Sequence, residues 1–216
     1  MTPTVIGEQL AAQIEFVCSD MWQPYLDVIR QKCSRALHIL DRFHIVAKMN
    51  KALDDVRAAE SRKMAQEGHP PLLKKSRWCV LKRRENLTSQ QKFRLRDLLR
   101  YNLQTVRAYL LKEDFQQFWE YTSPTWAGMF LDFWCYQTMR SRIEPMKKIA
   151  RTLRAHRTLL LNYFQGQEAV FQRCDRGAEQ QGQSNHEKIL WLSHLPHPGT
   201  RALSLTWQTT RAGAYP

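Results

Sequence analysis

Short apolar runs and longer spaced patterns alternate along the first quarter of the chain. The segment IEFVCSD, residues 14–20, is a short apolar run that ends in an acid, as buried strands often do. MWQPYLDVIRQKC follows with helical spacing, with Asp20 at the predicted N-cap and Pro24 in the first turn. ALHILDRFHIV then predicts a second strand that ends at Asp41. The order strand, helix, strand, helix favours parallel strand pairing.

Helical periodicity dominates the next part of the chain. A long helix is predicted from about Phe43 to Gln66, and GHPP at residues 68–71 breaks it. Every pattern from there to Phe164 predicts a helix, and Thr88 or Ser89 caps one of them. The stripes contain many aromatic residues, which we interpret as core between helices, with base-stacking platforms as the alternative. The most aromatic stripe contains Trp126, Phe130, Phe133 and Trp134.

These patterns predict a mainly α protein with a small α/β part. We place the α/β domain at residues 1–67 and a helical domain at residues 68–164. Residues 165–216 follow neither period and form a separate tail segment.

The charge composition indicates which kind of molecule the protein binds. Lysine and arginine number 33 against 20 acidic residues, and the net charge is +13. Such a charge favours polyanions and makes nucleic acid the leading partner, although charge alone leaves DNA, RNA and an anionic membrane surface open. With 43% hydrophobic residues and no apolar run long enough to cross a bilayer, a globular protein without a membrane partner is expected.

The cysteines indicate the compartment. They are dispersed without the CxxC spacing of a zinc ribbon, which predicts free thiols in a reducing cytoplasm. We expect the first four to be buried as small hydrophobic residues. The five are Cys18, Cys33, Cys79, Cys135 and Cys174.

Two acids occupy positions suited to metal chemistry. Asp20 ends the first predicted strand beside a helix start, where a rigidly held carboxylate can face the crevice at the carboxyl edge of a sheet. Asp41 and His44 stand three residues apart at the next such junction and could ligate a metal or brace a carboxylate. The alternative for all three is structural, as helix caps and an ordinary polar contact.

Basic residues gather in two places. LKKSRWCVLKRREN surrounds Trp78 with cations, and a later helix repeats them at helical spacing. Both sets are candidates for contact with DNA phosphates, and a solvated charged face is the alternative for each. The candidates are Lys74, Lys75, Arg77, Lys82, Arg83, Arg84, Lys147, Arg151 and Arg154.

Several long blocks together carry a family resemblance. VCSDMWQPYLDVI, ALHILDRFHIVAKMNKALDDVR, LKKSRWCVLKRRENLT, RAYLLKEDFQQFWEY and MKKIARTLRAHRTLLLNYF closely resemble the ISL-three family of bacterial insertion-sequence transposases. The similarity runs from about Gly7 to Phe164. That family belongs to the DDE group, so the resemblance implies part of a ribonuclease-H-like core followed by a large helical insertion at residues 68–164.

The resemblance also implies chemistry. Two Mg²⁺ ions, with Mn²⁺ as an alternative, would be held by two aspartates and a glutamate while double-stranded DNA at the element ends is cut and joined. Asp20 matches the second acid, and Asp41 with His44 matches an acid-x-x-His signature that follows it. The first acid and the DNA-binding region would precede residue 1.

After Phe164 the sequence departs from the family. Codons compatible with VFQRCDRGAEQQGQS, read one base later, give FSSGVIEGLNNKAK, the family segment that contains the glutamate. In the same way QGQEA gives RAKKQ, which places a one-base slip, or a sequencing error that mimics one, at about Phe164 to Gln165. The tail from Gln165 to Pro216 is therefore predicted to be out of frame and disordered.

Three functional hypotheses follow. The first is a fragment of a transposase, inactive in its present form because one matched acid cannot hold two ions. The second is a catalytically dead remnant that binds DNA or an intact transposase. The third is an unrelated helical nucleic-acid-binding protein.

The frameshift hypothesis predicts a result at the level of DNA. Resequencing the gene from upstream of Met1 through the end of the tail should reveal one extra base near the codons for Phe164 and Gln165. Removing that base should restore the glutamate-containing frame. A verified reading frame that encodes the present tail, with no family segment in the next frame, would contradict the hypothesis.

Overall fold

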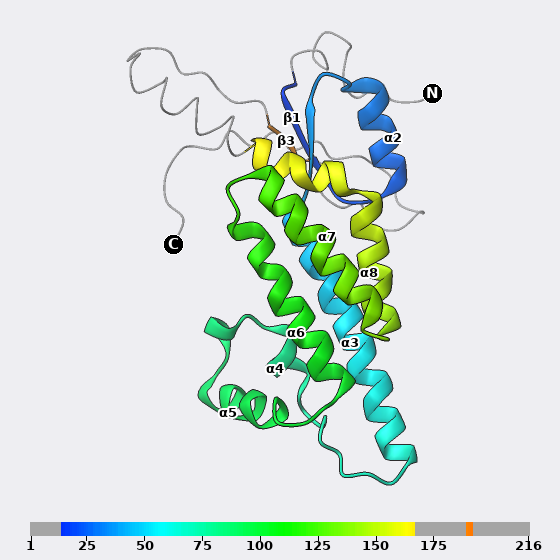
Figure 1. Cartoon of the computed structure of the whole chain (residues 1–216), viewed down its shortest axis with the longest axis vertical. Coiled ribbons are helices and arrows are strands. Elements are labelled where there is room, and N and C mark those ends of the chain that lie inside the picture. Colours follow the sequence, from blue (N-terminus) through cyan, green and yellow to red (C-terminus); the bar gives the residue numbers. More distant parts are fainter. Residues whose placement is uncertain (1–13, 167–188, 192–216) are drawn as a thin grey trace, which may run out of the picture. The chain divides into compact units, whose positions relative to one another are not determined.

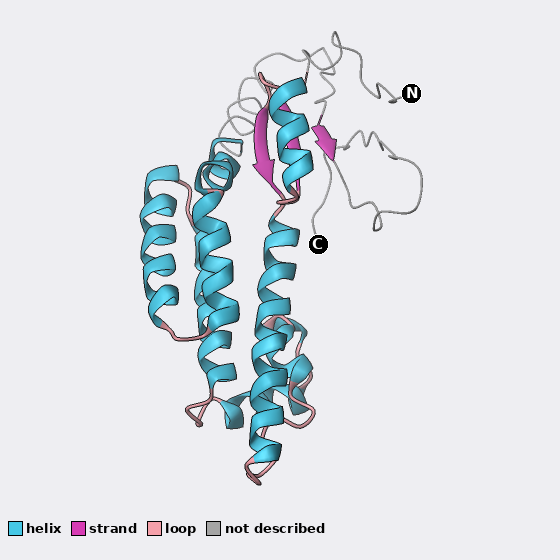
Figure 2. Ribbon diagram, turned by 90° about the vertical axis from the view of Figure 1, so that its right-hand side faces the viewer, coloured by secondary structure: helices cyan, strands magenta, loops and turns pink. Residues whose placement is uncertain are grey.

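The computed structural model describes residues 14–166 and 189–191, and these form two compact units. The first unit comprises residues 1–44 and 158–216, and the second comprises residues 45–157. The first contains a small parallel sheet and the second is helical, so the predicted class, mainly α with a small α/β part, is confirmed (Figures 1 and 2). The cut between the units falls near residue 44, earlier than the predicted domain boundary at 67. Whether 1–67, 68–164 and 165–216 are domains stays a prediction.

The sheet of the first unit contains both predicted strands. β1 (Phe16–Ser19) lies between β2 (Leu37–Leu40) and β3 (Ile189–Trp191), and all neighbours are parallel. The crossover from β1 to β2 contains α2 (Gln23–Lys32), whose first turn includes Pro24. A helical crossover is what a parallel pair requires, because its strands cannot be joined by a hairpin.

The two faces of the sheet are covered differently. On one face, Val17 packs with Ile29 and Cys33 around α2. On the opposite face, the helix at residues 157–166 comes so close that a Cβ atom on Gly166 would lie 2.6 Å from Cδ1 of Ile39. A larger residue at position 166 would require the end of the Ile39 side chain to move.

The predicted disordered tail from Gln165 to Pro216 is described only in part. Gln165 and Gly166 belong to the preceding helix, and Ile189–Trp191 is β3, which pairs with β1. The other residues of the tail, with the frameshift segment and Cys174, lie outside the described residues.

The second unit is built from helices joined by short loops. The axes of α3, α6, α7 and α8 run roughly parallel, while α4 and α5 are shorter (Figures 1 and 2). The bounds are α3 (Arg42–Gln66), which begins in the first unit, α4 (Arg77–Leu81), η1 (Arg84–Asn86), α5 (Ser89–Leu98), α6 (Gln104–Gln116), η2 (Gln117–Glu120), α7 (Pro124–Arg140) and α8 (Glu144–Ala155).

Local signals in the sequence correspond to the observed helix ends. Gly68 follows α3 with φ of 68°, a conformation that favours glycine, and so the predicted break is confirmed. Thr88 caps α5 in a capping box with Gln91. The predicted stripe of α3 is also confirmed, because its four residues are all at most 4% exposed: Ile45, Met49, Leu53 and Val56.

The aromatic stripe of α7 is only partly core. Trp134 is buried, and its Nε1 donates to the carbonyl oxygen of Leu111 at 2.8 Å. Phe130 is half-buried, but Trp126 and Phe133 are 61% and 57% exposed. The interpretation of all four as core is therefore wrong for Trp126 and Phe133, because the buried side of α7 is centred on Ala127, Leu131 and Thr138 and these two rings lie outside it.

A carboxylate from α3 holds the start of α6. Glu60 accepts hydrogen bonds from the backbone N–H groups of Gln104 and Thr105 at 2.7 and 2.8 Å, and from the Thr105 hydroxyl at 2.6 Å. The N-cap residue Leu103 has no capping side chain, so Glu60 replaces the missing local cap. Its charge also faces the positive end of the helix dipole.

A buried lysine ties α6 to α4. The Nζ atom of Lys112 donates to the carbonyl oxygen of Val80 at 3.0 Å and lies 3.2 Å from Oε1 of Glu113. Burial lowers the pKa of the Lys112 ammonium, and Glu113 opposes that shift. The interaction fixes the end of α4, from which the basic segment continues into η1.

No helix in the described part of the chain is long and apolar enough to cross a membrane.

Replacing Glu60 tests the cap of α6. Glu60→Ala should lower the free energy of unfolding by about 2 kcal/mol, because two backbone donors and a hydroxyl lose their acceptor. Glu67→Ala is the matched control, since Glu67 is exposed and its carboxylate forms, among the described residues, ion pairs with Lys63 and His69 alone, at 3.8 and 3.5 Å. Urea denaturation followed by circular dichroism measures both. Equal losses in the two variants would contradict the capping role.

Candidate functional site

Asp20 and Asp41 lie side by side at the carboxyl edge of the sheet. Ser19 pairs with Leu40 in the register, and the backbone N–H of Asp41 donates to the carbonyl oxygen of Ser19 at 2.8 Å. Each acid therefore directly follows one residue of a paired position on adjacent strands. Neighbouring strands are about 4.8 Å apart, so the two carboxylates start from close backbone positions.

The Asp20 carboxylate holds the turn into α2. Its Oδ1 accepts a hydrogen bond from the backbone N–H of Trp22 at 3.0 Å. Asp20 is not the N-cap that the sequence predicts, because α2 begins at Gln23 and Trp22 occupies the cap position. The extra residues let Asp20 close an Asx turn before the helix starts.

Asp41 makes two polar contacts at once. Its Oδ1 accepts from the backbone N–H of Phe43 at 2.8 Å, which caps the first turn of α3. Its Oδ2 lies 3.5 Å from Nε2 of His44. The structure therefore brings Asp41 and His44 together as the sequence spacing predicts. The contact fits both the structural alternative and the bracing of a carboxylate.

The residues just before Asp20, Cys18 and Ser19, are buried. Burial, with a smaller effect from the charge of Asp41, raises the pKa of the Cys18 thiol to about 12. Cys18 is therefore protonated at neutral pH and is a poor nucleophile. Next to it, the Ser19 hydroxyl lies 2.7 Å from Nε2 of His38 and donates to the carbonyl oxygen of Asp20. The carboxylates of Asp20 and Asp41 are thus the side chains at this edge that can bind a cation.

The fit to a metal site is incomplete. Carboxylate oxygens are the ligands that Mg²⁺ prefers, and Asp20 and Asp41 supply them from neighbouring strands. A two-ion site needs several carboxylates, yet within residues 14–166 and 189–191 no three His, Cys, Asp or Glu side chains form a metal-binding group. The described residues therefore do not fit a two-metal centre.

Exposed aromatic residues flank both acids, a feature that the sequence reasoning missed. Trp22 is 54% exposed and Phe43 is 72% exposed. Each stands two residues after an acid and donates its backbone N–H to that acid. The repeated pattern acid-x-aromatic, DMW and DRF, was the signal available in the sequence.

Part of the predicted basic surface is neutralised within the protein. Arg77 pairs with Asp54 at 3.0 Å and stacks over Trp78. Both Lys147 and Arg151 pair with Glu144, at 3.0 and 2.8 Å, and their hydrogen bonds lower the pKa of that carboxyl. Two of the three predicted cations on α8 thus have a partner already.

The other predicted cations are freer to meet phosphates. Arg154, the third cation of α8, lies close enough to lower the pKa of the buried Cys135 thiol, which burial raises to about 11. In the described part of the chain, the remaining five form no ion pair with a carboxylate: Lys74, Lys75, Lys82, Arg83 and Arg84. The segment around α4 and η1 is therefore the better candidate for DNA contact.

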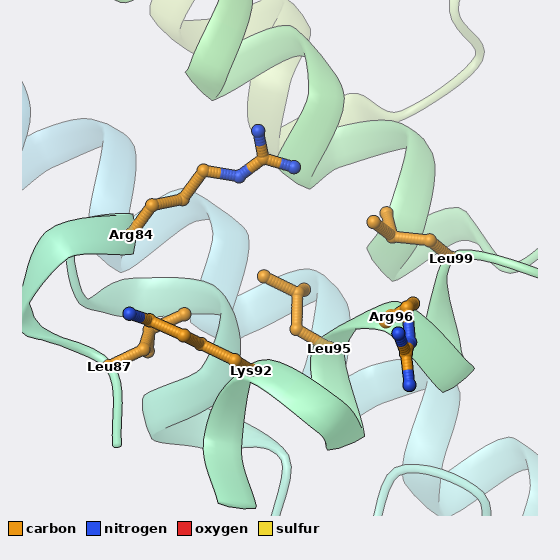
Figure 3. Close-up of a pocket in the computed structure, with 6 residues that line it drawn as sticks. All are labelled: Arg84, Leu87, Lys92, Leu95, Arg96 and Leu99. Carbon is orange, nitrogen blue, oxygen red and sulfur yellow. The ribbon is translucent and has the colours of Figure 1, made fainter. Parts of the chain in front are cut away.

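A pocket adjoins this segment. It has a volume of about 280 Å³, and its lining joins Arg84 of η1 to Lys92 and Arg96 of α5 (Figure 3). Leucines form the apolar part of the lining: Leu87, Leu95 and Leu99. The sequence reasoning missed Lys92 and Arg96, although their spacing of four on a helix places them on one side.

Comparison with known proteins gives consistent matches. Residues 4–170 match the family model DDE_Tnp_ISL3, described as "Transposase". The chain is 31% identical over 148 residues to the transposase for insertion sequence element IS1001 of Bordetella parapertussis, covering 68% of this chain and 36% of that protein. It is 28% identical over 177 residues to the transposase for insertion sequence element IS1557 of Mycobacterium tuberculosis, covering 72% and 40%. The chain thus spans well under half the length of the curated relatives it matches. No solved structure matches.

Conservative substitutions can separate the structural role of the acids from their charge. Asp20→Ala and Asp41→Ala should each lower the free energy of unfolding by about 0.5–1 kcal/mol, because a backbone donor loses its acceptor. Asp20→Asn and Asp41→Asn should cost only a few tenths of a kcal/mol, since the amide oxygen still accepts. Urea denaturation provides the measurement. If the Asn variants lose as much stability as the Ala variants, the charges rather than the hydrogen bonds stabilise this edge.

Proposed function

The chain belongs to the ISL3 family of DDE transposases, and from this premise we propose that it is a part of an enzyme that cuts and joins DNA at the ends of an insertion sequence. The observation that carries the proposal is the pair Asp20 and Asp41 at the carboxyl edge of a parallel sheet. In open α/β sheets this edge is where ligands bind. We also propose that the chain contains part of a ribonuclease-H-like core followed by a helical insertion.

In this proposal Asp20 is a catalytic acid, with Asp41 and His44 as additional candidates for a metal site. Mg²⁺, or Mn²⁺ in its place, is the cation that carboxylates of this kind bind. The described residues provide two carboxylates at the edge, so we propose that the chain by itself does not cleave DNA.

The proposed substrate is double-stranded DNA. The net charge of +13 supports binding to the phosphate backbone, and so do the five cations from Lys74 to Arg84 that form no ion pair with a carboxylate among the described residues. We also propose action in the cytoplasm, because the four cysteines that the structure describes are buried free thiols.

A second function is favoured by the same observations. The chain has a basic surface, and among its described residues no three acidic, histidine or cysteine side chains form a metal-binding group. Such a chain can bind DNA as an inactive remnant of the enzyme. Such a remnant would occupy DNA ends or contact an intact transposase without cutting.

Binding to duplex DNA containing an element end tests the proposal. The chain should bind with an affinity that falls steeply with salt, and Lys82→Ala/Arg83→Ala should lower the slope of log K against log salt by about 1.8. Lys147→Ala/Arg151→Ala is the matched control and should change the slope less, because both side chains already pair with Glu144. Fluorescence anisotropy over a salt series measures both. Absence of binding at low salt would overturn the proposal.

The same complexes, incubated with Mg²⁺, distinguish the enzyme from the remnant. We expect no nicking on a denaturing gel. Nicking that is lost in Asp20→Asn would show that the chain is an active nuclease.

A further inference from the structure

The pocket on α5 combines positive charge with an apolar floor. We propose that it binds one unpaired nucleotide at a DNA end, an inference that rests on the proposed function of DNA binding. Arg84, Lys92 and Arg96 would contact phosphate oxygens, while the leucines would contact the sugar and base.

The charge of the lining is the first argument. Three cations and no carboxylate line the pocket, and Lys92 and Arg96 stand one helical turn apart. Like charges at this spacing destabilise a helix slightly, and a bound anion offsets that cost. A concave surface with charges of one sign also raises the local concentration of the opposite ion.

A contrast on the same helix strengthens this argument. Arg94 is turned away to other partners: it donates to Asp97 at 3.1 Å and to the carbonyl oxygen of Leu72 at 2.6 Å. In the described part of the chain, Lys92 and Arg96 have no such ion pair. One side of α5 is thus tied into the fold and the other carries exposed charge.

The apolar floor limits the kinds of ligand that suit the pocket. Leu87 and Leu95 are each 5% exposed, and Leu99 is half-buried at the end of α5. Figure 3 shows Leu95 between the cations, with Arg84 above it. A phosphate alone would not use this floor. A duplex keeps its bases stacked inside, whereas an unpaired nucleotide can leave the stack and bring its base, together with its sugar, to the leucines.

Size and surroundings agree with one nucleotide. The volume of about 280 Å³ falls just below the roughly 300 Å³ at which pockets for drug-sized ligands begin. Beside the rim, Phe93 is 65% exposed, and the guanidinium of Arg96 lies 5.2 Å from the centre of its ring. An exposed aromatic ring next to a cation offers a platform for the adjacent base.

The test measures binding of the full chain to three labelled DNAs by fluorescence anisotropy. They are a blunt duplex, the same duplex with a short single-stranded overhang, and that overhang without its bases. The pocket variant is Lys92→Ala/Arg96→Ala. The control is Arg100→Ala/Arg107→Ala, which removes the same charge from exposed positions in the same unit but outside the pocket. Because all four residues are exposed, circular dichroism should show unchanged folding.

The wild-type chain should prefer the overhang over the blunt duplex by about tenfold, the value of one stacked base, and the abasic overhang should lose that preference. The pocket variant should lose the preference and lower the salt slope for the overhang by about 1.4. The control variant should keep the preference.

Three outcomes would overturn the inference. If the wild-type chain binds blunt and overhang DNA equally, or if both double variants weaken all three DNAs alike, the pocket has no specific role although DNA binding stands. If the chain binds none of the DNAs at low salt, DNA binding fails and the pocket assignment fails with it. The abasic DNA leaves the protein unchanged, so its result does not depend on how any variant folds.

Discussion

The parallel register between β1 and β2 is the constraint on which the rest of the first unit depends. Ser19 opposite Leu40, extended by the hydrogen bond from Asp41 to Ser19, brings two acids that are far apart in sequence to one edge. A slip of one residue would turn every side chain of β2 to the other face and separate the acids. Packing on both faces opposes such a slip, because Val17 faces α2 while Ile39 meets Gly166.

The second unit depends on single polar side chains that join helices across loops. Glu60 ties α3 to α6, Lys112 ties α6 to α4, and Arg94 ties α5 to the loop that contains Leu72. Each is at least half-buried or satisfies a backbone group that lacks a local partner. These ties hold α4, η1 and α5 in place, and the pocket and the freer cations belong to the same elements. Rigid support of this kind is what a binding surface on short helices needs.

The sequence predicted those features that depend on local patterns. The strands β1 and β2, the stripe of α3, the break near Gly68 and the Thr88 cap all follow from spacing or from one residue type. It did not predict that Trp126 and Phe133 are exposed, because periodicity marks an apolar side without saying what covers it. Periodicity could not predict the pocket either, because Arg84 belongs to η1 and Lys92 to α5, and only the fold brings these two elements together. Asp20 was placed as a cap because sequence does not resolve whether a helix starts one residue or three residues later.

The structural role of the two acids is compatible with the catalytic role that we propose for them. In Asp41 one carboxylate oxygen holds the helix start and the other faces His44, so the backbone contact fixes the direction in which the second oxygen points. A side chain fixed in this way needs little further ordering to bind a cation, which is the advantage of placing acids at strand ends. The fold and the proposed activity therefore depend on different contacts. Without a third acid the proposed two-ion site is incomplete, yet the capping bonds of Asp20 and Asp41 and the ties of the helical unit are still formed. A chain without catalytic activity can therefore retain the basic surface that we propose binds DNA.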